Sequence, residues 1–154
     1  MNHQSEKSLA LLLALSLHSS IDELHKSLSE KGFDDIRPIH GYLFSSLIPN
    51  GATGIELANH LGITKQAVSK MIDYLEKCGY VMREPHPTDK RGKMIILAER
   101  GWLVVNEKNL ILSDIEGRLI EKIGKDRMRL LKEDLSTIVT DKDEKSMPKA
   151  RPIW

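Results

Sequence analysis

Apolar residues recur every three or four positions along most of the chain, and this spacing predicts a mainly helical protein. The longest stripe covers residues 5–31, where leucines and isoleucines repeat until Gly32 breaks the pattern. Further helices are predicted at about 36–47, 54–60, 64–78, 99–123 and 125–139. Residues 140–154 lack this period and are expected to form a flexible tail.

Local signals predict where the central helices begin and end. Thr53 has the residue type of an N-cap, and Glu56 three positions later completes a capping box. Thr64 is expected to cap the next helix, while Gly62 and Gly79 indicate a turn and a stop. These positions predict two short helices separated by a tight turn.

The period of the pattern changes after Gly79. Residues 80–84 and 93–97 are rich in apolar and β-branched side chains, which is typical of strands. The segment between them, PHPTDKRG, combines proline, glycine and charge. We therefore predict a β-hairpin with a long basic tip directly after the second short helix.

The two short helices fit a helix-turn-helix. Such a unit needs a small residue in its first helix, a glycine in the turn and a buried aliphatic residue in its second helix. Ala58, Gly62 and Val68 have these types at the required spacing. The surrounding core would come from Leu57, Leu61, Ile63 and Met71.

The second of these helices is expected to have two faces. The predicted inner face consists of Ala67, Val68, Met71, Ile72 and Leu75. The outer face carries Lys65, Gln66, Ser69 and Lys70 near the helix N-terminus, the end that a recognition helix inserts into the major groove. Glutamine can read adenine, and lysine can reach guanine or a phosphate. An ordinary solvated helix face would look similar, so this pattern alone leaves both interpretations open.

The predicted hairpin favours the DNA-binding interpretation. Lys90, Arg91 and Lys93 cluster at or beside its tip, where a basic finger can place an arginine in the minor groove. Asp89 has the wrong sign for DNA and is expected to orient Arg91 and hold the tip. The alternative is a solvated hairpin turn without a partner.

The stretch TGIELANHLGITKQAVSKMIDYLEKCGYV followed by PHPTDKRGKMIILAERG resembles the winged-helix regulators of the multiple-antibiotic-resistance regulator (MarR) family. Its most specific piece is Asp89-x-Arg91 in the hairpin. Ala98 departs from the threonine that the family commonly has as a helix cap, and Gly92 makes the tip more flexible than a bulkier residue would.

The resemblance implies a fold that is mainly α with a small β-wing: a winged helix-turn-helix plus terminal dimerisation helices. It also implies a homodimer that binds a near-palindromic operator on double-stranded DNA, and a small aromatic or phenolic effector. Residues near the first, second and fifth helices, such as His18, His40, Tyr42 and Trp102, are candidates for an effector pocket or for the core. The expected DNA-binding residues are Thr53, Thr64, Lys65, Gln66, Ser69, Lys70, Lys90, Arg91 and Lys93.

This interpretation divides the chain into four parts. We expect an N-terminal dimerisation helix in residues 1–35 and a winged helix-turn-helix DNA-binding domain in 36–98. C-terminal dimerisation helices would follow in 99–139, and a flexible tail in 140–154. The predicted function is a sequence-specific transcription regulator, acting as a ligand-responsive repressor. A winged helix that binds proteins instead of specific DNA is the alternative, because fold does not fix function.

Charge and composition add modest support. The whole chain has a net charge of +1, but its parts differ. Residues 64–93 have seven basic and four acidic residues, giving +3, whereas residues 1–63 have four and seven, giving −3. The basic segment is thus the one predicted to meet DNA.

Other functions find less support in the sequence. The single cysteine, Cys78, rules out an internal disulfide and suggests the cytoplasm; we expect it to be structural rather than a redox sensor. Compact metal-ligand spacings and phosphate-loop or nucleophile motifs are missing, so no metal, cofactor or enzyme activity is expected. The pair Asp34-Asp35 is expected to favour a helix start by its negative charge. The most apolar run, residues 9–17, is too short to span a membrane.

Overall fold

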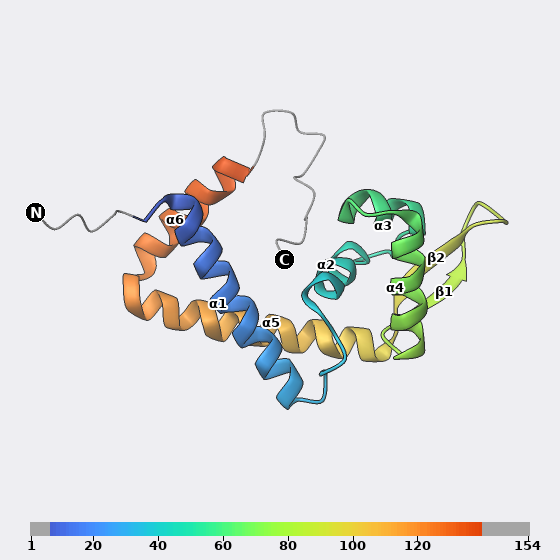
Figure 1. Cartoon of the computed structure of the whole chain (residues 1–154), viewed down its shortest axis with the longest axis horizontal. Coiled ribbons are helices and arrows are strands. Elements are labelled where there is room, and N and C mark those ends of the chain that lie inside the picture. Colours follow the sequence, from blue (N-terminus) through green and yellow to red (C-terminus); the bar gives the residue numbers. More distant parts are fainter. Residues whose placement is uncertain (1–6, 140–154) are drawn as a thin grey trace, which may run out of the picture.

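The computed structural model describes residues 7–139, in which helices and one small sheet follow the predicted order (Figure 1). The elements are α1 (Leu9–Glu30), α2 (Pro38–Ser46), α3 (Gly54–Leu61), α4 (Lys65–Lys77), β1 (Val81–Pro85), β2 (Lys93–Leu97), α5 (Glu99–Ile123) and α6 (Lys125–Val139). The predicted fold class is confirmed, with observed bounds within a few residues of those expected. The tail predicted for 140–154 lies outside the described residues, and the four-part domain division remains a prediction.

The helices α2, α3 and α4 and the β1–β2 hairpin form what we call the central lobe. Its core contains the fully buried side chains Leu43, Phe44, Leu57, Leu75 and Tyr80. The two strands pair antiparallel, from Val81 opposite Leu97 to Pro85 opposite Lys93. This core is continuous with buried residues of α1 and α5, such as Leu28 and Val104, and the hairpin extends from one side of the central lobe (Figure 1).

A short bridge ties the start of α3 to the hairpin. Ala52 and Ile95 exchange two backbone hydrogen bonds, of 3.0 and 2.8 Å. The neighbouring Gly51 has φ +79°, and a Cβ there would lie 2.6 Å from the Ile95 carbonyl oxygen. Glycine is needed at this position because both the backbone conformation and the close approach exclude a side chain.

The helices α1, α5 and α6 form what we call the frame. Figure 1 shows α1 crossing the long α5, with α6 folding back at the end of α5 far from the hairpin. Lys31 pairs with Glu107 at 2.9 Å across α1 and α5, and Lys132 pairs with Glu116 at 2.8 Å across α6 and α5. None of the described helices is both long and apolar enough to cross a membrane.

The frame leaves many large apolar side chains exposed. On α1 the exposed set is Leu9, Leu11, Leu12, Leu13 and Leu15. On the outer parts of α5 and on α6 it is Leu110, Leu112, Leu119, Ile123, Leu130, Leu131, Ile138 and Val139. We call these residues the frame stripe. Residues 7–139 of one copy leave it exposed.

Candidate nucleic-acid interface

The N-termini of α3 and α4 are held by the threonines predicted to cap them. The Thr53 hydroxyl accepts the Glu56 backbone N–H at 3.2 Å, and the Glu56 carboxylate accepts the Thr53 N–H at 2.7 Å. The Thr53 backbone N–H, followed by its hydroxyl, lowers the pKa of Glu56, so the cap holds a charged carboxylate. Thr64 accepts the Ala67 N–H at 3.1 Å. Both predicted caps are confirmed.

The turn between α3 and α4 also follows the prediction. Gly62 ends α3 in the left-handed conformation with φ +65°, and its N–H bonds to the Ala58 carbonyl oxygen. Leu57, Leu61 and Val68 are buried where the two helices meet. The sequence therefore builds a helix-turn-helix that fixes the direction of α4.

The two faces of α4 are largely as predicted. Val68, Ile72 and Leu75 are buried, and Met71 packs against the core. The outer set of Lys65, Gln66, Ser69 and Lys70 is exposed. Ala67 was expected in the core, and this prediction is wrong, because Ala67 is exposed. It lies one helical step, about 100°, from the centre of a narrow apolar face.

The hairpin is braced against α4 by Arg83 on β1. Its guanidinium donates to the Asp73 carboxylate at 2.5 Å and also to Glu76, both on α4. The neighbouring carboxylates raise the pKa of Arg83, first through the hydrogen bond to Asp73. This brace neutralises acidic charge on α4 and fixes the hairpin beside it. Arg83 is not among the residues that the sequence predicted for the site.

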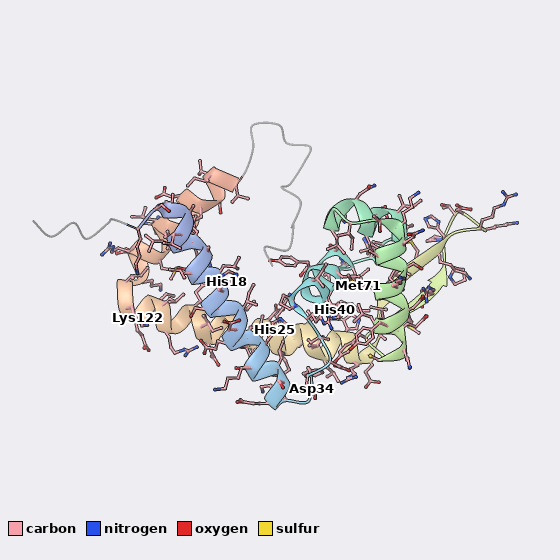
Figure 2. All side chains as sticks on the ribbon, in the orientation of Figure 1. His18, His25, Asp34, His40, Met71 and Lys122 are labelled. Carbon is pink, nitrogen blue, oxygen red and sulfur yellow. The ribbon has the colours of Figure 1, made fainter. Side chains whose placement is uncertain are left out.

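The hairpin tip is organised by backbone hydrogen bonds to side chains. The Asp89 carboxylate accepts the Arg91 backbone N–H at 2.9 Å, so Asp89 holds the tip through the main chain and not through the guanidinium. His86 Nδ1 accepts the Asp89 N–H at 3.0 Å and the Thr88 N–H at 3.2 Å. Lys90 and Arg91 remain exposed at the tip, where side chains extend away from the body of the molecule (Figure 2).

A cleft of about 420 Å³ separates α4 from the hairpin. Its lining brings together Thr53, Lys65, Ser69 and Lys93 from the predicted site, together with His86. The other predicted residues lie outside this lining: Thr64, Gln66 and Lys70 at or on α4, and Lys90 and Arg91 at the tip. The predicted residues are therefore spread from the outer face of α4 across the cleft to the tip.

Two further candidates from the sequence have structural roles. Cys78 is half-buried and packs against the core, and its carbonyl oxygen accepts a hydrogen bond from Arg100. Asp35 does not favour a helix start as expected: α2 begins at Pro38, and the Asp35 carboxylate binds Tyr80 and Arg100. Within residues 7–139 no group of three or more acidic, histidine or cysteine side chains could hold a metal ion.

Comparisons with known proteins agree with this geometry. Residues 34–92 match the model of the MarR family. The chain is similar to E. coli MarR in its apo form, with 24% identity over 87% of this chain and 98% of that one and a TM-score of 0.68. It is similar to a mutant of S. aureus MepR bound to an oligodeoxyribonucleotide, with 22% identity over 86% and 96% and a TM-score of 0.61.

A further similar structure is the transcriptional repressor CouR bound to a 23-mer DNA duplex. It shares 25% identity over 86% of this chain and 93% of that one, with a TM-score of 0.69. The resemblance identified from the sequence is thereby confirmed.

Proposed function

From the match of residues 34–92 to the MarR-family model, we propose that the protein is a sequence-specific DNA-binding transcription regulator. It would act as a homodimeric, ligand-responsive repressor on a near-palindromic operator. The observation that carries the proposal is the surface formed by α4 and the hairpin. An exposed polar helix face lies beside a basic tip, and Arg83 fixes the two relative to each other.

The proposed contacts fall into two groups. Gln66 and Lys70, on the outer face of α4, read base edges in the major groove, while Arg91 enters the minor groove. Lys65, Ser69 and Lys93 line the cleft and contact phosphates, as does Lys90 at the tip. His86 lines the same cleft and shapes the tip.

The two threonines in the predicted site contribute differently. The Thr53 hydroxyl already donates to the Glu56 carboxylate at 2.9 Å, so it has a lone pair but no hydrogen for a phosphate. The Thr64 hydroxyl accepts from Ala67, and its hydrogen can be donated to a phosphate. We propose Thr64 as the direct contact and Thr53 mainly as the residue that holds α3 in place.

The frame stripe supports a dimer. Many of the large apolar side chains of α1, α5 and α6 are exposed, and an exposed apolar patch of this kind is typical of an interface. A second copy placed by two-fold symmetry would cover it and would set two α4 helices about one DNA turn, ~34 Å, apart. That spacing is what a near-palindromic operator requires.

An effector site is proposed in a cavity of about 250 Å³ between the frame and the central lobe. Its walls include Leu24 and Leu28 of α1, Phe44 of α2 and Val104 of α5. Of the four candidates for a pocket or for the core, Tyr42 lines this cavity, whereas His18, His40 and Trp102 do not. His25 also lines it, and Figure 2 shows His18 farther from α2 than His25.

Lys108 gives this cavity its chemical character. Its ammonium donates to the Ser45 hydroxyl at 3.2 Å, and burial lowers the pKa of Lys108. An aromatic or phenolic anion would fill the apolar walls and offset the desolvation of this charge. It can release DNA only if it binds the two dimer geometries unequally.

The test is a salt titration of binding between the full chain and labelled DNA flanking its own gene, with random DNA as competitor. A regulator should bind tightly and specifically, and log K should fall with log salt by about 0.9 for each phosphate contacted. Weak binding that does not distinguish this DNA or any operator selected from a random pool would favour the protein-interaction alternative.

A further inference from the structure

Three segments that are distant in the sequence meet at the C-terminal end of α4. They are the α1–α2 linker, residues 78–80 after α4, and the first turn of α5 (Figure 1). Arg100 of α5 connects them. Its Nη1 donates to Asp35 Oδ2 at 3.0 Å and to the Cys78 carbonyl oxygen at 2.9 Å. Its Nη2 donates to the Gly32 carbonyl oxygen at 3.2 Å.

Asp35 and two tyrosines complete the connection. The hydroxyl of the fully buried Tyr80 donates to the Asp35 carboxylate, and the Tyr74 hydroxyl of α4 donates to the Asp35 backbone oxygen at 2.5 Å. The Arg100 guanidinium lies 4.4 Å from the centre of the Tyr80 ring, within cation–π range. Although burial would raise the pKa of Asp35, Tyr80 and Arg100 hold it below its ordinary value, so the carboxylate stays charged.

The backbones at this point are in direct contact. The Ala98 N–H donates to the Tyr80 carbonyl oxygen at 2.9 Å. A Cβ on Gly101 would lie 2.1 Å from that same oxygen, so the first turn of α5 fits only because residue 101 is glycine. The backbone just after the recognition helix therefore packs directly against the first turn of α5 in the frame.

We propose that Arg100, acting through Asp35 and the Cys78 carbonyl, is the positioning residue that sets the angle between the recognition helix and the dimer frame. The inference rests on the proposed function. In a dimer, this angle determines the separation and relative rotation of the two α4 helices. Arg100 would thus determine how strictly the protein selects the spacing between operator half-sites, although it contacts no DNA.

The chemistry of arginine suits this role. Its planar fork binds Asp35 and two backbone carbonyls at once, while its face lies on Tyr80. Lysine keeps the charge but offers a single ammonium on a flexible stem, so it cannot make the same set of contacts. With lysine at position 100 the helix angle should fluctuate more, and the competent geometry should be populated for a smaller fraction of the time.

The first test compares operator binding by the wild type, Arg100→Lys and Tyr80→Phe. Each protein is titrated with its operator and with versions whose half-site spacing is changed by one base pair. Both variants should lose discrimination between native and altered spacing by about threefold or more. The matched control is Arg118→Lys, which alters the Arg118–Glu23 pair inside the frame and should keep wild-type discrimination.

The ratio of affinities for native and altered half-site spacing distinguishes a change in helix position from a loss of protein stability. A variant that is merely destabilised loses affinity equally for every spacing, and its discrimination ratio stays unchanged; that result would overturn the proposal. If the wild type binds no operator, the proposed DNA function fails first, and the role of Arg100 in spacing fails with it.

A second measurement needs no DNA. With Cys78→Ser as background, a spin label at Lys77→Cys, at the exposed end of α4, reports the distance between the two recognition helices of the free dimer. The distance distribution should be narrow with Arg100 and clearly broader with Arg100→Lys. Equal widths would show that Arg100 does not fix the helix angle, whatever the DNA measurements give.

Discussion

The central lobe and the frame differ in how much of their apolar side-chain surface is buried. Leu43 and Leu57 in the central lobe are 0% exposed, whereas Leu9 on α1 is 61% and Ile138 on α6 is 67% exposed. Among the largest fully buried side chains, the frame supplies Val104, and the others belong to the central lobe. The buried core thus lies mainly in the central lobe, and we propose that the exposed frame stripe is covered by a second copy of the chain.

This difference predicts that DNA binding and dimer assembly can be altered by separate mutations. The central lobe should keep its internal geometry when the proposed dimer is lost, because no residue of the buried core belongs to the frame stripe. The frame, in contrast, has no completed apolar core at its outer end. Changes in the frame should therefore alter assembly, and changes on the outer surface of the central lobe should alter DNA binding without altering assembly.

The largest effect is expected from breaking the frame. The double change Leu12→Glu and Leu131→Glu places two charges in the proposed interface and should convert the dimer into monomers in analytical ultracentrifugation. Operator affinity should fall by about 100-fold or more, because the second half-site is no longer bound within the same molecule. Met82→Glu, an equally exposed apolar position on β1, should remain dimeric. A dimeric double variant would show that the interface lies elsewhere.

The next effect concerns the hairpin tip. Arg91→Ala should weaken operator binding by about tenfold or more, since it removes the proposed minor-groove contact but leaves the Asp89 hydrogen bond to the backbone of residue 91. Fluorescence anisotropy gives the affinity, and sedimentation should show an intact dimer. Lys122→Ala on the frame removes the same charge far from the tip and serves as the control. An equal loss of operator affinity in both variants would show that the effect comes from the net charge of the protein and not from a contact at the tip.

A smaller and more selective effect is expected on α4. Gln66→Ala should cost roughly 1–3 kcal/mol on the true operator, because a base edge loses its partner. On random DNA the cost should be much less, so the ratio of the two affinities is the measurement. A loss of the same size on both DNAs would make Gln66 a backbone contact.

The smallest effect is on stability and is confined to the central lobe. Burial, with the nearby positive charge of Arg37, lowers the pKa of His40 to about 4. Below about pH 6.5, His40 therefore becomes protonated in the unfolded chain but stays neutral in the folded state. The free energy of unfolding decreases as the pH falls from there toward 4.

Urea denaturation should show a drop of about 1 kcal/mol from this residue between pH 7 and 5.5. His40→Gln keeps an acceptor for the Arg37 N–H without titrating in this range and should lose that part of the drop. An identical pH dependence in this variant would assign the loss to other groups, among them His25, whose pKa burial also lowers.

Local features were predictable from the sequence, and long-range polar contacts were not. The caps at Thr53 and Thr64 and the turn at Gly62 depend on residues at most five positions apart, so spacing alone reveals them. The wrong prediction for Ala67 arose because an apolar residue can lie beside a narrow buried face as well as within it.

The polar connections to Arg83 and Arg100 gave no comparable signal. Arg83 reaches residues seven and ten positions away, across the end of a helix, and Arg100 reaches Asp35 across 65 positions. No period or motif relates residues at such separations, because the contacts depend on how elements pack in three dimensions. The predicted DNA-contacting residues lie nearly all on α4 and the hairpin, so local spacing was enough to propose them; their role stays a prediction.

The contact between Arg100 and the Cys78 carbonyl oxygen bears on how such a protein can diverge. A main-chain oxygen is present whatever side chain the position carries. This hydrogen bond at the end of α4 therefore does not depend on which side chains α4 carries. Under the proposed function, residues 65, 66, 69 and 70 can therefore be substituted to recognise a new operator while the contact of Arg100 with the backbone is kept. Duplicated copies of the gene could acquire different targets by changing a few surface residues.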